Sequence, residues 1–306
     1  MELAHEDLAV QLMGLALEHP LMNAAGTCKF VDDVKQLSRA STSAIMVGSI
    51  TIQERAGNSG NVYVAGPVFS LNSLGMPNPG ASYYEKHLPA MAALAHDAGK
   101  RLLVSVAGFT PHEYGELAAL AFDRGSDAVE LNLGCPNVWQ EGQQKPIACF
   151  DPLLVAEILR CVDLRVGSEA RVAVKISPFS DPFALGEVAR VIEQHSVAKA
   201  VTTTNTFPNA FAFDGAGQPM ISPGGGLAGF AGPALKPIGL GQVIQLRSLL
   251  PERIQIIGVG GVSHGRDVLE YLRAGAIAVQ IATAYLERYE RVFSTLLAEL
   301  IEVTVG

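Results

Sequence analysis

The chain has 306 residues, of which 49% are hydrophobic and 17% are charged, and its formal net charge is −8. This composition is typical of a folded protein with a large core, and an acidic balance without a basic block disfavours nucleic acid as a partner. Because no apolar run approaches the roughly 18–20 residues that span a bilayer, and the acidic N-terminus does not predict a signal peptide, we expect a cytoplasmic protein that does not bind membranes.

Eight strand-like runs follow one another along the chain. Most are nearly continuous apolar segments, which is typical of parallel strands covered on both faces. The runs are Leu21–Ala25, Ala44–Ser49, Arg101–Ala107, Ala128–Leu133, Arg171–Ile176, Ala198–Thr204, Ile254–Val259 and Ala276–Ile281. Between them, amphipathic patterns predict helices over Glu113–Asp123, Pro152–Val162, Pro182–Gln194, Leu240–Leu250, Gly265–Ala274 and Glu287–Glu302. Asp181-Pro182 and Ser263-His264-Gly265 are typical helix starts.

Eight successive strand–helix units predict an α/β fold, namely a single (β/α)8 TIM barrel domain over residues 1–306. A doubly wound sheet is the alternative, but its first strand is usually followed by a GxGxxG turn, and Ala25-Gly26-Thr27-Cys28 does not match that pattern. Residues 1–20 precede the first strand, and we expect them to plug or flank the bottom of the barrel.

Three connections that follow strands are too long to be plain turns. They cover about Thr51–Tyr84, Pro136–Phe150 and Thr206–Pro237. In a barrel all three open on the C-terminal face, where active sites of this fold are found.

Cys135 lies in the sequence Glu-Leu-Asn-Leu-Gly-Cys-Pro-Asn at 130–137, where a buried strand ends and a loop begins. A thiol at that point can move a proton, and the carboxamides of Asn132 and Asn137 can bind the edge of a flat polar ring. The alternative is a buried cysteine in a tight turn, which is a common arrangement. The four cysteines have no CxxC or zinc spacing, so we expect free thiols and no metal site.

Four asparagines fall at predicted strand ends or in loops of the same face: Asn72, Asn132, Asn137 and Asn205, the last followed by Thr206. Each alone is typical of a turn. Together, beside a cysteine, they favour a binding site for a ring with amide or imide edges.

The last two strands end in glycine-rich or small residues that suit a phosphate. Gly258-Val259-Gly260-Gly261 and Ile281-Ala282-Thr283-Ala284 place backbone N–H groups where barrels of this kind often hold one, aided by a following helix N-terminus. A pair of tight turns is the alternative. Lys175 ends the fifth strand, and a lysine in an apolar run requires a partner, either an electron-rich cofactor or an internal acid.

The motifs taken together resemble the class 1 dihydroorotate dehydrogenases. The segments are Asn-Ser-Leu-Gly-Met-Pro-Asn, Glu-Leu-Asn-Leu-Gly-Cys-Pro-Asn, Val-Lys-Ile-Ser, Thr-Asn-Thr, Gly-Pro-Ala-Leu-Lys-Pro and Ile-Ile-Gly-Val-Gly-Gly-Val, in matching order from Leu21 to about Ala284. The resemblance implies a (β/α)8 enzyme that contains FMN and oxidises (S)-dihydroorotate to orotate in pyrimidine synthesis. A cysteine base marks class 1, whereas the membrane-bound class 2 enzymes use serine.

The resemblance also implies roles for individual residues. Cys135 would take the C5 proton as general base while C6 delivers a hydride to the flavin. The residues implied to bind substrate are Asn72, Asn132, Asn137, Asn205 and Thr206. Those implied at the FMN site are Ala25, Gly26, Gly48, Ser49, Asn132, Lys175, Gly232, Gly260, Gly261, Ala282 and Thr283. The family suggests a homodimer, and its members use fumarate or pass electrons to a partner subunit, so the electron acceptor stays open.

Gly48 departs from the family pattern, because class 1 enzymes carry a lysine at the end of the second strand that contacts flavin and substrate. Lys29 or Arg55 in neighbouring loops are candidates to replace that cation. The departure keeps two other functions open: a related flavin oxidoreductase acting on another cyclic imide or enone, and a non-catalytic binder of FMN or a pyrimidine. The tRNA dihydrouridine synthases share a barrel and an Asn-x-Gly-Cys-Pro motif, but the acidic pI of about 5.4 disfavours RNA.

Overall fold

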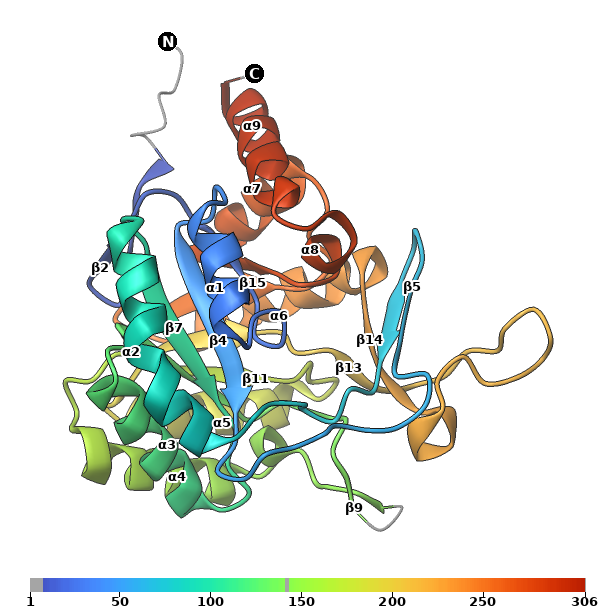
Figure 1. Ribbon diagram of the computed structural model, residues 1–306, viewed down its shortest axis with the longest axis horizontal. Helices are drawn as coiled ribbons and strands as arrows, with labels where there is room; N and C mark the ends of the chain where they lie inside the picture. The colour runs from blue at the N-terminus through green and yellow to red at the C-terminus, as the bar shows by residue number, and fades with distance from the viewer. Residues whose placement is uncertain (1–7, 141–142, 306) are drawn as a thin grey trace.

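Eight parallel strands close into a barrel at the centre of the computed structural model (Figure 1). The structure describes residues 8–140 and 143–305. In order round the barrel the strands are β3 (Leu21–Asn23), β4 (Ala44–Ile50), β7 (Arg101–Val106), β8 (Ala128–Asn132), β11 (Val172–Ile176), β12 (Ala198–Thr203), β15 (Gln255–Val259) and β16 (Ala278–Ile281). Because β16 pairs with β3, the ring is closed, which confirms the TIM barrel and rules out the open doubly wound sheet.

A helix follows each barrel strand and covers the outside of the ring. The helices are α1 (Val31–Ser38), α2 (Ala81–Asp97), α3 (Pro111–Asp123), α4 (Pro152–Val166), α5 (Pro182–Gln194), α6 (Lys236–Leu249), α7 (Gly265–Ala274), α8 (Thr283–Arg288) and α9 (Arg291–Val305). The predicted start of α5 is confirmed. Asp181, directly before Pro182, is the N-cap residue, and its side chain accepts a hydrogen bond from the Phe183 N–H. Within the described ranges, none of these helices has the length and apolar character needed to cross a bilayer.

Two helical predictions need correction. Helices α1 and α2 have no counterpart among the predicted helices, and α2 contains Pro89, which interrupts the helical sequence pattern. The single helix expected over Glu287–Glu302 is two helices, because Tyr289 adopts a φ of 55° between α8 and α9. A residue in the left-handed region cannot continue a right-handed helix.

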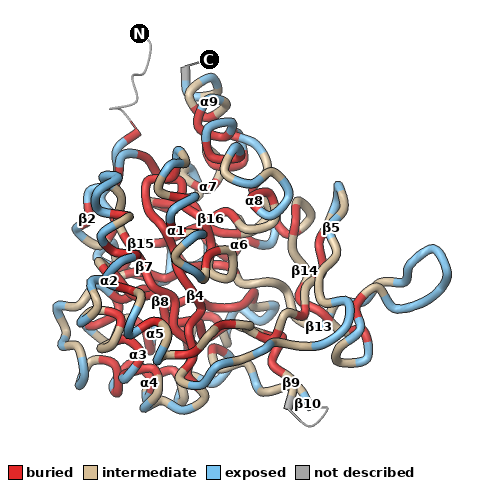
Figure 2. Tube along the Cα trace, in the orientation of Figure 1, coloured by how far each residue is buried: buried red, intermediate tan, exposed pale blue. Residues whose placement is uncertain are grey.

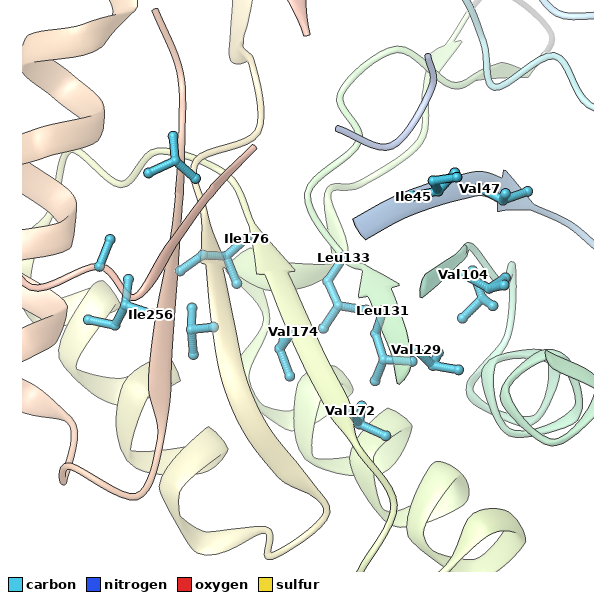
Figure 3. Close-up of a cluster of buried hydrophobic side chains, with 14 of the residues drawn as sticks. Ile45, Val47, Val104, Val129, Leu131, Leu133, Val172, Val174, Ile176 and Ile256 are labelled. Carbon is cyan, nitrogen blue, oxygen red and sulfur yellow. The ribbon is translucent and has the colours of Figure 1, made fainter. Parts of the chain in front are cut away.

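Alternate residues of each barrel strand face opposite ways and build two separate apolar layers. Val172, Val174 and Ile176 of β11 belong to the layer shared with the surrounding helices (Figure 3). The intervening Ala173 belongs to the layer inside the barrel, together with Met46 and Ala128. Figure 2 shows that the barrel strands are buried along most of their length.

The bottom of the barrel is filled by a hairpin of β1 (Val10–Leu12) and β2 (Leu15–Leu17). Leu12, Leu15 and Leu17 are buried against the interior layer of the barrel. The expected plug is thus confirmed for residues 8–20, while residues 1–7 lie outside the described residues.

The three long connections carry small elements of their own. The first has β5 (Tyr63–Ala65) and β6 (Ser70–Asn72); the second has β9 (Trp139–Gln140), β10 (Gln143–Gln144) and the 3₁₀ helix η2 (Ala148–Phe150); the third has β13 (Phe207–Ala210), η3 (Pro223–Gly226), β14 (Ala228–Ala231) and η4 (Pro233–Leu235). The first and third connections meet in a four-stranded sheet, ordered β13-β14-β6-β5, beside the barrel (Figure 1). We call it the rim sheet.

Candidate active site

Two adjoining cavities lie where the barrel strands end and the rim sheet begins. Their volumes are about 890 Å³ and about 580 Å³ with the open solvent at their mouths included, and we call them the first and second cavity. The residues that line both are Ala25, Lys175, Asn205, Thr206, Ala231, Ala282 and Thr283. Because these residues line both cavities, the two cavities form one continuous site on the C-terminal face of the barrel.

Strand alternation explains why polar side chains point into this site. Ala128 and Ala173 belong to the interior layer, so residues two positions further along each strand also face the barrel axis. Those positions hold Glu130 and then Asn132 on β8, and Lys175 on β11. The strand ends therefore present a carboxamide and an ammonium to the cavities.

Lys175 is only 5% exposed and is held by two interior groups. Its Nζ donates to Gln280 Oε1 at 2.9 Å and lies 3.4 Å from Glu130 Oε1. The second oxygen of the fully buried Glu130 accepts hydrogen bonds from Gln280 at 2.7 Å and Thr202 at 2.9 Å. Lys175 thus has the internal acid partner that was one alternative, and it lines both cavities as well. Glu130 and Gln280 were missed from sequence, although Glu130 lies two residues before Asn132 on the same strand face.

The four asparagines form two hydrogen-bonded pairs. The Asn137 side-chain amide donates to Asn72 Oδ1 at 2.7 Å, and that of Asn205 donates to Asn132 Oδ1 at 3.1 Å. The Asn132 amide donates to Ser49 Oγ at 2.9 Å. All five residues line the first cavity, and these hydrogen bonds hold the four carboxamides in place before any ligand arrives.

The Thr206 hydroxyl is buried in the site without a hydrogen-bond partner among the described residues. Its backbone N–H donates to Asn205 Oδ1 at 2.8 Å, so the residue is held in place. Gly229 packs against Thr206 so closely that a side chain there would collide with the hydroxyl. A buried hydroxyl without a partner is costly, so Thr206 is a polar group whose hydrogen-bonding capacity the described residues leave unused.

Cys135 is a free, partly buried thiol on the wall of the first cavity. Burial raises the pKa of this thiol, whereas the backbone N–H of Asn137 and the positive charges of Arg55, Lys145 and Lys175 lower it. A thiol acts as a base through its thiolate. These opposing effects on the pKa therefore set the fraction of Cys135 that is thiolate and can take up a proton.

Lys145 and Arg55 both contact the ring of Phe109. Lys145 Nζ lies 4.1 Å from the ring centroid and Arg55 Cζ lies 5.0 Å from it. Lys145 also donates to the Gly108 carbonyl at 3.3 Å. Lys145 was missed from sequence, because its position beside Cys135 depends on how the second long connection folds.

Glycines form the floor of the second cavity, beside Thr283. Gly232 has a φ of 81°, and a Cβ there would lie 2.8 Å from the Ser70 nitrogen. Gly261 has a φ of 71°, and a Cβ there would lie 2.6 Å from the Lys236 nitrogen. At both positions only glycine fits against the neighbouring backbone, and the N–H groups of a glycine-rich turn that lines a cavity are suited to bind a phosphate. The start of α7 contributes less than expected, because the Asp267 carboxylate already accepts the N–H groups of Ser263 and His264.

Gly48 is the predicted site residue that lines neither cavity. It has a φ of 109°, and the Ser105 carbonyl oxygen occupies the space that a Cβ would need. The lining of the two cavities therefore gives no support to the predicted contact between Gly48 and a cofactor. The other residues predicted for the substrate and FMN sites line at least one of the two cavities.

Three comparisons with known proteins agree with one another on the family that this chain resembles. The family profile described as dihydroorotate dehydrogenase matches residues 7–304. Dihydroorotate dehydrogenase (fumarate) of Trypanosoma cruzi is 32% identical over 303 residues, which cover 97% of this chain and 93% of the relative. Dihydroorotate dehydrogenase A (fumarate) of Lacticaseibacillus paracasei is 32% identical over 304 residues, covering 98% and 99%. The crystal structure of DHODH from Eimeria tenella in complex with ferulenol has the same fold, with a TM-score of 0.81 at 19% identity over 97% of this chain and 84% of that one.

Proposed function

The chain belongs to the dihydroorotate dehydrogenase family, whose members are oxidoreductases acting on CH–CH groups, and on this basis we propose that it oxidises (S)-dihydroorotate to orotate with bound FMN. The observation that carries the proposal is Cys135 beside two carboxamide pairs and an unpartnered Thr206 hydroxyl on one cavity wall. Carboxamides offer a donor and an acceptor on one neutral group, which matches the imide edge of a dihydropyrimidine.

Cys135 is the general base in this proposal. It removes the C5 proton of dihydroorotate, while C6 loses a hydride, so the ring gains a C5=C6 double bond. A bound FMN would supply the redox chemistry as the acceptor of that hydride. The paired asparagines orient the ring so that C5 faces the thiol, which is the positioning that makes proton transfer efficient.

The residues present fit an FMN. Gly232, Gly260, Gly261, Ala282 and Thr283 line the second cavity, where close backbone approach suits one terminal phosphate. For the flavin ring we propose contacts with Ala25, Gly26, Ser49, Asn132 and Lys175, which line the first cavity. The Lys175 ammonium there would favour negative charge on the ring.

Reconstitution with FMN followed by anaerobic addition of dihydroorotate tests the proposal. We expect the flavin absorbance to bleach and to return when fumarate is added, fumarate being the acceptor that the names of both relatives carry. Bound FMN that dihydroorotate does not bleach would contradict the substrate and favour a related flavin oxidoreductase acting on another cyclic imide or enone. Failure to bind FMN would contradict the cofactor.

The remaining expectations concern the protein in the cell. We propose a cytoplasmic homodimer in which all 306 residues form one functional domain. Light scattering of the purified protein gives the oligomeric state, and pull-down from the native host distinguishes direct turnover from transfer to a partner subunit.

A further inference from the structure

Lys29 lies on the wall of the first cavity, in the loop between β3 and α1. Its backbone N–H and that of Phe30 donate to Asp33 Oδ2 at 2.8 Å and 2.9 Å, so the loop is anchored at this residue. Its ammonium, by contrast, makes no hydrogen bond or ion pair with any residue in the ranges 8–140 and 143–305. A fixed backbone therefore holds an unpaired cation beside the cavity.

The Lys29 side chain is partly buried, so its ammonium is partly removed from water. Burial lowers the pKa of Lys29, and the Asp33 carboxylate opposes that effect. Removing a charge from water without a partner is unfavourable. A ligand carrying negative charge would supply the missing partner.

The backbone beside Lys29 is joined to the end of β4. The Gly48 N–H donates to the Cys28 carbonyl at 2.9 Å, and Gly26 donates to the Gly48 carbonyl in return. Gly48 itself cannot carry a side chain towards the cavity, because the Ser105 carbonyl fills that space. A cation on this stretch of wall is thus supplied by the neighbouring loop, through Lys29, rather than by the end of β4.

Arg55, the other candidate cation, is engaged elsewhere. Its Nε donates to the Gly75 carbonyl at 3.0 Å and its guanidinium lies over Phe109. It is not among the residues that line either cavity. The structure therefore distinguishes between the two candidates in favour of Lys29.

We propose that Lys29 is a cofactor-facing residue whose ammonium stabilises the negative charge of the reduced flavin. The inference rests on the proposed function for the presence of FMN, but not for the identity of the substrate. It assigns Lys29 to the flavin rather than to the substrate because Lys29 shares its loop with Ala25 and Gly26, which are proposed to contact the flavin ring, and because the preceding Cys28 is hydrogen-bonded to Gly48, the neighbour of Ser49. Lys175 and Lys29 would then be two cations contributed by different barrel strands and loops.

The test compares Lys29→Gln, Lys29→Arg and the exposed control Lys35→Gln, all as FMN-loaded protein. The readouts are the dissociation constant of the sulfite adduct of the flavin and the midpoint potential of bound FMN. Neither requires turnover. For Lys29→Gln we expect sulfite to bind at least tenfold more weakly and the two-electron potential to fall by about 30 mV for each tenfold loss in the stability of the reduced form. Lys29→Arg should recover most of both losses, and Lys35→Gln should change neither.

Unchanged sulfite binding and potential in Lys29→Gln would overturn the proposal. So would a change confined to orotate affinity, because that would place the ammonium against the substrate carboxylate. Melting temperature and FMN content check that the variants are folded, and Gln keeps the backbone N–H that anchors the loop to Asp33. If the wild type takes up FMN but is not reduced by dihydroorotate, the proposed substrate fails while the Lys29 test stays valid.

Discussion

The side-chain amide of Asn137 donates a hydrogen bond of 2.7 Å to the carboxamide of Asn72, although 65 residues separate them in the chain. Asn72 ends β6 of the rim sheet, whereas Asn137 follows β8 of the barrel. Burial raises the pKa of the Cys135 thiol, and the Asn137 backbone N–H, which faces the thiol, offsets part of that rise. Asn137 thus links the proposed base, the carboxamides proposed to bind substrate and the rim sheet, so the site is largely arranged before a ligand binds.

Replacing Cys135 by alanine should leave FMN bound and slow flavin reduction by dihydroorotate about 100-fold to 10,000-fold, the usual contribution of a general base. Cys135→Ser should retain part of the rate at high pH, because a hydroxyl is harder to deprotonate than a thiol. Cys161 on α4 is a buried cysteine away from the cavities and provides the control, Cys161→Ala. Anaerobic stopped-flow spectroscopy measures the rates. Equal rates in wild type and Cys135→Ala would exclude this base.

Removing the charge of Lys145 should shift the pH dependence of kcat/KM. Cys135 must lose its proton to act, so activity rises with pH through the pKa of the thiol. Burial raises that pKa and the positive charge of Lys145 lowers it. In Lys145→Gln the rise should move to higher pH, while exposed Lys86→Gln should keep the wild-type profile. A profile that moves to lower pH would show that another group controls the rate.

Gly261→Ala should weaken FMN binding at least about tenfold, equivalent to about 1.4 kcal/mol. A Cβ at this position would lie 2.6 Å from the Lys236 backbone nitrogen, so the backbone proposed to bind the phosphate would have to move. Gly241→Ala on α6 is a matched control, because a Cβ there meets nothing within 4 Å. Titration of FMN fluorescence gives both affinities. The same affinity in the two variants would argue against a phosphate at Gly261.

Gly48→Ala should destabilise the protein by about 3 kcal/mol or more, from unfavourable positive φ together with overpacking against Ser105. Gly167→Ala separates the two effects, because Gly167 has a φ of 81° but open space around it. Its cost should be about 1–2 kcal/mol. Urea denaturation followed by circular dichroism measures both. The same steric conflict means that Gly48→Lys would not place an ammonium in the cavity without moving β4.

Asp267→Asn should lower the free energy of unfolding by about 1–3 kcal/mol at neutral pH, because its carboxylate caps α7 and accepts from Lys236 at 2.6 Å. Burial acts to raise the pKa of Asp267, but Lys236 and two backbone N–H groups lower it overall. A lowered folded-state pKa gives stability that is present above the unfolded pKa near 3.9 and is lost as the pH falls through the folded value. The difference between variant and wild type should therefore shrink in acid. The more exposed Glu270→Gln should cost less than about 1 kcal/mol.

The barrel and much of the site could be predicted because their signals are local. Apolar runs predict the strands, and the position of Asn132 and Lys175 near strand ends predicts that they face the open end of the barrel. The contact of Lys145 with Phe109 could not be predicted, because it joins two connections whose paths depend on tertiary packing. The left-handed backbone of Tyr289, a residue type that rarely adopts it, gives no sequence signal either.

The rim sheet has a thermodynamic consequence. β6 ends at Asn72 in the first cavity, and it pairs with β14, which ends directly before Gly232 in the second. FMN would reach both cavities and so restrict the motion of both strands, and a substrate that then binds in the first cavity would lose less conformational entropy than it would alone. Cofactor and substrate should accordingly increase each other's affinity by the same factor. The amides of Leu71 and Phe230, opposite one another in the sheet, should slow in hydrogen exchange together when FMN alone is added.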